Sequence, residues 1–167
     1  TPPVDWYALA PLLILLAGCG VCVLAAVLVP ESWKLPVGAV TAVGCFVGAA
    51  VTAAYLFADS ERPESIVAGA AVRDRLGSFS GLLICAIGVL AAAVAVRHGL
   101  GGHRAEYYAL LLAAAAGMVF LVTATNLMTL FLGLEWFSIA LYVLCAMDTH
   151  REASLEAGLK YLIVGAF

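Results

Sequence analysis

Runs of about 20 apolar residues recur along this chain, and their recurrence limits the folds that it can adopt. A helix rises about 1.5 Å per residue, so about 20 residues cross the roughly 30 Å of hydrocarbon in a bilayer. Hydrophobic residues make up 65% of the 167 residues and charged residues only 11%, with a mean hydropathy of +1.09. This composition excludes a soluble globular domain, and one targeting peptide cannot explain several runs. The sequence therefore predicts an integral membrane protein.

The chain divides into about six helices joined by short polar connections. Pro30 ends the first run, and a tight connection over Glu31–Pro36 then reverses the chain, whereas Asn126 allows a very short turn between two later runs. The longest polar stretch, Asp59–Arg75, is expected to be a surface loop with an interfacial or hairpin piece. We therefore predict an all-α, polytopic transmembrane helix bundle. The expected helices are Ala8–Val29, Val37–Ala58, Phe79–Val96, Tyr107–Ala124, Leu127–Met147 and a shorter one from about Glu152 to Phe167.

Metal, redox and nucleic-acid sites have little support in the sequence. The five cysteines lie within apolar runs, where buried thiols act as small hydrophobic groups. Cys19 and Cys22 form a C-x-x-C pair, but no second pair and no nearby histidine accompany it. His98 and His103 share a polar turn, where a metal or proton site is the alternative to two solvated histidines. The net charge of −3 is small and dispersed, which argues against a nucleic-acid partner.

Glu135 is the first candidate functional residue, because it lies inside the apolar run Leu127–Met147. A carboxylate near the bilayer centre costs about 3 kcal/mol, so such a residue is a functional candidate by default. Ser138 and Tyr142 follow at i+3 and i+7 and share a helix face with Glu135. We interpret this face as a hydrated seam in which Glu135 relays protons, supported by Ser138 and Tyr142. The alternative is a structural glutamate satisfied by the backbone or by a neighbouring helix.

Lys160, in the last run, is the second candidate relay residue. It has two candidate partners, namely Glu156, one helical turn earlier, and Glu135 of the preceding helix. A buried lysine exchanges its proton readily, which is a property that a proton carrier needs. In the alternative interpretation, Lys160 extends toward Glu156 at the headgroups and carries no proton.

Three segments give the chain a likeness to a known family. The first begins at Glu106 and reads EYYALLLAAAAGMVFLVTATNLMTLFLGLEWFSIALYVL, and SLEAGLKYLIVGAF follows near the end. Together with VDWYALAPLLILLAG at the start, they resemble subunit N of bacterial NADH-quinone oxidoreductase, the respiratory complex I. The patterns LGLE-x-x-S-x-x-L-Y-V-L and S-x-E-A-x-L-K-Y distinguish this family from its paralogues, which are subunits L and M and the multisubunit sodium/proton antiporters.

The resemblance implies a fourteen-helix antiporter-like fold that contains two inverted five-helix repeats. Residues 1–106 would hold three N-terminal transmembrane helices, and residues 107–167 would hold the start of the first repeat. Glu135 matches the family's fifth-helix glutamate, and Lys160 matches its sixth-helix lysine. In the family this glutamate partners a lysine of the seventh helix, and lysines of later helices continue the transfer. Because those helices would follow Phe167, we expect the sequence to be the front part of a longer protein.

The resemblance also implies a function. The chain would belong to a membrane-arm subunit of proton-pumping NADH:quinone oxidoreductase in the bacterial inner membrane, with other membrane subunits and lipids as partners. It contains no G-x-G-x-x-G after a strand and no cysteine cluster in a soluble segment. We therefore expect no cofactor and no redox centre in this chain, and NADH, FMN, iron–sulfur clusters and quinone in partner subunits. The alternatives are a subunit of a multisubunit sodium/proton antiporter and a structural membrane module.

Overall fold

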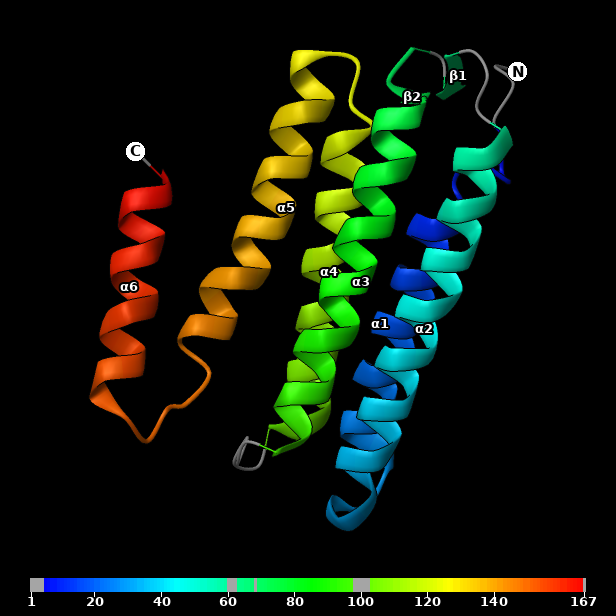
Figure 1. Ribbon diagram of the computed structural model, residues 1–167. Helices are drawn as coiled ribbons and strands as arrows, with labels where there is room; N and C mark the ends of the chain where they lie inside the picture. Colours follow the sequence, from blue (N-terminus) through cyan, green and yellow to red (C-terminus); the bar gives the residue numbers. More distant parts are fainter. Residues whose placement is uncertain (1–4, 60–62, 68, 98–102, 167) are drawn as a thin grey trace.

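The computed structural model describes residues 5–59, 63–67, 69–97 and 103–166, which form six helices and one small β-hairpin (Figure 1). Five of these helices are long and apolar enough to cross a membrane, which confirms the predicted all-α polytopic bundle. The elements are α1 (Ala10–Leu28), α2 (Glu31–Asp59), β1 (Glu64–Val67), β2 (Ala71–Arg73), α3 (Arg75–Arg97), α4 (Arg104–Val122), α5 (Leu127–Cys145) and α6 (Glu152–Ala166).

The first four helices pack together, and the last two extend from this group. α1 packs on α2 and α4, α3 packs on α2 and α4, and consecutive helices run in opposite directions (Figure 1). α5 packs mainly against α4, and α6 packs mainly against α5. α6 has 15 residues and therefore rises about 22 Å. Its position at the outer edge leaves most of its described side chains exposed.

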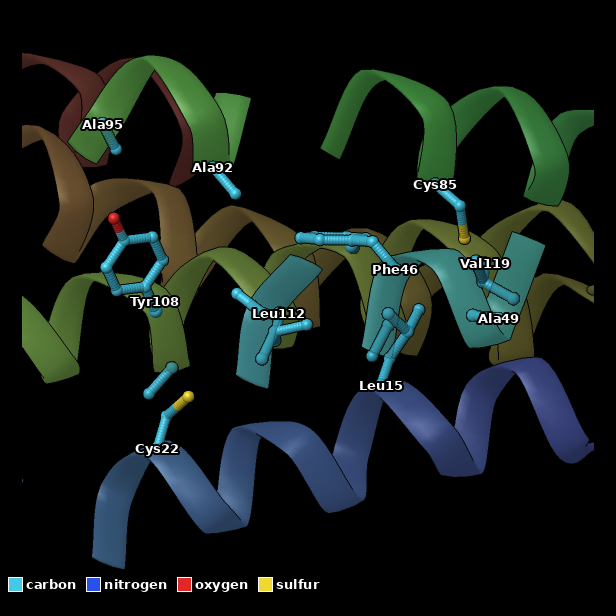
Figure 2. Packing of buried hydrophobic residues seen from close by; sticks show 14 residues of the cluster. Leu15, Cys22, Phe46, Ala49, Cys85, Ala92, Ala95, Tyr108, Leu112 and Val119 are labelled. Carbon is cyan, nitrogen blue, oxygen red and sulfur yellow. The ribbon is translucent and has the colours of Figure 1, made fainter. Parts of the chain in front are cut away.

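The core lies between α1, α2, α3 and α4 and consists largely of small residues and a few large ones (Figure 2). The Phe46 ring packs directly on Gly88, and a Cβ at Gly38 would lie only 2.7 Å from Cδ2 of Tyr108. Small residues let membrane helices approach closely, so large side chains fill the spaces beside them. The buried members are Leu15, Cys22, Ala42, Phe46, Ala49, Cys85, Ala92, Ala95, Tyr108, Ala109, Leu112, Ala115, Ala116 and Val119.

The predicted reversal over residues 31–36 is wrong, because this segment already belongs to α2. Val29 and Pro30 make the reversal, and Val29 has extended backbone angles. Pro36 removes one backbone hydrogen bond in the second turn of α2 without ending the helix. Glu31 lies in the first turn, where a negative charge is favourable, and its Oε2 lies 2.9 Å from Nζ of Lys34. These local contacts stabilise the first turn of α2.

The polar loop between α2 and α3 contains the expected hairpin. β1 and β2 are antiparallel, and Glu64 lies opposite Arg73. Gly69 in the turn has a φ of +79°, a conformation that glycine adopts without steric cost. Ile66 and Ala71 are each 2% exposed, so the hairpin is packed against the helix ends. It lies at the same end of the bundle as the connection between α4 and α5 (Figure 1).

Candidate functional site

Glu135 lies near the middle of α5, and its position follows from the way this helix begins. Asn126 caps the helix, since its Oδ1 accepts hydrogen bonds from the Thr129 backbone N–H at 2.8 Å and from the Thr129 hydroxyl at 3.0 Å. This arrangement confirms the short turn predicted at Asn126. Glu135 is partly exposed, and within the described part of the chain its carboxylate takes part in no ion pair.

Two glycines set the face that α5 turns toward α4. A Cβ at Gly117 would lie 2.7 Å from the backbone nitrogen of Phe137, and one at Gly133 would lie 2.8 Å from Cα of Leu121. At about 100° per residue, Glu135 lies roughly 200° around α5 from Gly133. The carboxylate therefore lies on the side of α5 opposite α4. The predicted seam of Glu135, Ser138 and Tyr142 thus follows this outer side, although Ser138 itself is buried.

The lower part of this seam is covered by α6. The Tyr142 and Tyr161 rings meet edge to face with their centroids 4.9 Å apart, and the Tyr142 hydroxyl contacts Gly165. One turn farther along α5, a Cβ at Gly158 would lie 2.6 Å from Cβ of Ala146. Tyr142 therefore serves as a contact between two helices as well as a member of the polar face.

Lys160 pairs with Glu156, and the structure does not bring it to Glu135. The Lys160 Nζ lies 2.6 Å from Glu156 Oε1, and these side chains are 72% and 64% exposed. Lys160 is two residues after Gly158, so it lies about 200° around α6 from the contact with α5. Because Tyr161 lies opposite Tyr142, Lys160 is level with Val143, about 12 Å along α5 from Glu135. Of its two candidate partners, the local one forms the pair.

A groove between α4, α5 and α6 was not anticipated from the sequence. It has a volume of about 650 Å³, and apolar side chains such as Leu110, Ile139 and Leu162 line most of it. His103 and Glu106 lie among its lining residues, with 4.0 Å between Nδ1 and Oε1. The sequence signal was their i, i+3 spacing at the start of a helix. His98, the other histidine of this turn, lies outside the described residues.

The described residues contain no group of three or more His, Cys, Asp or Glu side chains that could hold a metal ion. The five cysteines are free thiols, and Cys19 and Cys22 belong to the packed part of α1. The ionisable side chain that remains to be explained is therefore Glu135. Among the Asp, Glu, Lys and Arg residues of the five long helices, it is the one in the middle of its helix.

Five helices able to cross a membrane, one of which carries a carboxylate at its centre, define a polytopic membrane protein with an ionisable group inside one of its membrane helices. A family model described as "NADH:quinone oxidoreductase/Mrp antiporter, TM" matches residues 124–167, which include α5 and α6. The chain belongs to the family of NADH-quinone oxidoreductase subunit N. Two relatives that align with nearly the whole chain support this assignment, and they agree with the resemblance found in the sequence.

The chain is 38% identical to NADH-quinone oxidoreductase subunit N 2 of Roseiflexus castenholzii over 172 aligned residues, which cover 99% of this chain and 33% of the relative. It is 34% identical to NADH-quinone oxidoreductase subunit N of Chloroflexus aggregans, over 99% of this chain and 34% of the relative. The chain therefore spans about a third of the length of these relatives.

Proposed function

We propose that this chain forms part of a membrane-arm subunit of a proton-pumping NADH-quinone oxidoreductase in the bacterial inner membrane. Its partners are other membrane subunits of the complex and the surrounding lipids. NADH, FMN, iron–sulfur clusters and quinone belong to those partners, and this chain contributes proton transfer without a redox centre of its own. The likeness to subunit N along 99% of the chain supports this proposal.

The position of Glu135 is the observation that carries the proposal. A carboxylate in the middle of a membrane helix is costly, and it is retained where it serves a pathway for ions or protons. Glu135 lies on the side of α5 opposite α4, so a cationic group from another helix can approach it from that side. We propose that Glu135 holds such a cation charged until a change in the complex separates the two. By linkage, the same change alters the proton affinity of both groups.

Glu135→Gln in the intact complex tests this role. The substitution keeps the size of the side chain but removes its charge, so the number of protons pumped per NADH oxidised should fall to less than half. Proton uptake into inverted membrane vesicles and NADH oxidation are measured in parallel. Glu152→Gln, an exposed change in the first turn of α6, is the matched control and should leave the ratio unchanged. Unchanged pumping in Glu135→Gln would refute the proposed role.

Lys160 is proposed as a second relay residue that depends on groups outside this chain. Its pair with Glu156 is exposed, which leaves both groups open to a neighbouring helix or subunit. The sodium/proton antiporter alternative stays a second candidate, because the description of the matching family model names Mrp antiporters beside NADH:quinone oxidoreductase. Sodium dependence separates the two functions, because a proton pump retains its activity when sodium is replaced by potassium. In a purely structural module, polar substitutions would reduce assembly of the complex before they reduced pumping.

A further inference from the structure

The β1–β2 hairpin is fixed to the helix bundle by its own side chains. The Arg73 side chain is largely buried. Its Nη1 lies 3.5 Å from Oδ2 of Asp59, the last residue of α2, and its Nη2 lies 3.1 Å from Oε2 of Glu64 in β1. Ile66 and Ala71 bury their apolar side chains against the helix ends. The hairpin is therefore packed against the helix bundle, and its ion pair with Asp59 joins it to the end of α2.

The same hairpin is bonded to the connection between α4 and α5. The Val72 N–H donates to the Thr123 carbonyl at 2.9 Å, and the Thr125 N–H donates to the Ala70 carbonyl at 3.2 Å. The Gly69 carbonyl accepts two further hydrogen bonds, from the Thr125 hydroxyl at 2.5 Å and from the Asn126 side-chain amide at 3.4 Å. These contacts join residues that are more than fifty positions apart in the sequence.

Asn126 connects this network to α5. Its amide oxygen caps the helix at Thr129, while its amide nitrogen reaches the hairpin at Gly69. We propose that the hairpin is a clamp that fixes the start of α5, and that Thr125 and Asn126 are positioning residues for Glu135. This inference rests on the proposed function, because it assigns the clamp a role in proton transfer through Glu135.

Besides the hairpin, the start of α5 is held by α4, which Gly133 approaches closely at Leu121, whereas the first two residues of α5 are exposed. Leu127 and Met128 are 81% and 71% exposed, and α5 packs mainly on α4 and α6. Glu135 lies nine residues after Asn126, about 13 Å along a continuous helix. A helix moves as a rigid element over this distance, so a shift or rotation at its first turn is passed on to the carboxylate. The clamp and the contact with α4 at Gly133 therefore together set the depth and the orientation of Glu135.

Thr125→Val in the intact complex tests the clamp, because it removes the hydroxyl that donates to Gly69 and keeps the shape of the side chain. Hydrogen exchange of the backbone amides in residues 125–130 should become about fivefold faster, as expected for one lost hydrogen bond. Protons pumped per NADH should fall, while NADH oxidation is unchanged. Thr125→Ser keeps a hydroxyl at this position, so its hydrogen exchange and its protons pumped per NADH should match those of the unchanged protein.

Thr52→Val is the matched control, because the Thr52 hydroxyl donates to the Gly48 and Ala49 carbonyls within α2 and takes no part in the contacts between the hairpin and α5. It should leave both exchange and pumping unchanged. Unchanged exchange in Thr125→Val overturns the clamp, and faster exchange with normal pumping overturns the positioning role. If Glu135→Gln abolishes pumping while Thr125→Val changes neither value, the clamp alone fails. If Glu135→Gln leaves pumping unchanged, the proposed function fails and the positioning role fails with it.

Discussion

The two ionisable side chains singled out by the sequence have different surroundings. Lys160 meets Glu156 one turn earlier on its own helix, and both side chains are largely exposed. Glu135 has no partner of this kind among the described residues, and it lies on the outer side of α5. The i, i+4 spacing of Glu156 and Lys160 is a local property, so the sequence predicted it as one of two possibilities. The absence of a contact between Lys160 and Glu135 depends on how α6 packs against α5.

The Glu156–Lys160 pair should contribute little to the stability of the protein. An exposed i, i+4 pair contributes about 0.3–0.5 kcal/mol, because water and side-chain entropy offset most of the attraction. A double-mutant cycle with Glu156→Gln and Lys160→Met, measured by unfolding in detergent micelles, should therefore give a coupling energy of at most about 0.5 kcal/mol. A coupling energy above about 2 kcal/mol would contradict the exposed position and indicate a buried pair.

At the scale of the elements, the sequence predicted most of the helices, because a membrane helix is recognised from the length and hydropathy of its apolar run. The start of α5 was found from Asn126, a capping residue whose effect is local. The start of α2 was missed, because Pro36 suggested a break that the second turn of the helix tolerates. The bonds between the hairpin and Thr125 were also missed. They join distant parts of the chain, and no local pattern encodes them.

The contact between α4 and α5 should be more sensitive to a single methyl group than any exposed glycine position. A Cβ at Gly117 would lie 2.7 Å from a backbone atom of Phe137, which cannot move aside without displacing α5. Gly117→Ala should therefore destabilise the protein by about 1–3 kcal/mol. Thermal unfolding in detergent micelles measures this effect.

Gly44→Ala is the control for this substitution, because a Cβ at Gly44 would have no heavy atom of another helix within 4 Å. It adds the same methyl group to a membrane helix, and the higher helix propensity of alanine should leave stability unchanged or raise it by up to about 1 kcal/mol. Equal losses in Gly117→Ala and Gly44→Ala would show that the close contact between α4 and α5 is not formed in the protein.

For the whole molecule, the alternating direction of the helices assigns the polar connections to two opposite ends. The hairpin and the turn at Asn126 lie at one end, and the C-terminal ends of α1, α3 and α5 lie at the other (Figure 1). The distribution of positive charges between the two ends does not determine which end faces the cytoplasm. Arg73 and Arg75 lie at the hairpin end, and the opposite end holds Lys34, Arg97, Arg104 and Arg151. The sequence left this orientation open, because the excess is too small to decide it.

Labelling of introduced cysteines tests whether α3, α4 and α5 all cross the membrane. Ser65 lies in β1 and Thr149 lies in the connection before α6, and these three helices separate the two positions. An odd number of crossings places them on opposite sides, so a membrane-impermeant thiol reagent should label Ser65→Cys from one side and Thr149→Cys only from the other. The background carries Cys145→Ala, because Cys145 is the exposed native thiol at the end of α5. Labelling of both positions from the same side would mean that one or all three of these helices do not cross, and Glu135 would lose its place inside the bilayer if α5 is among them.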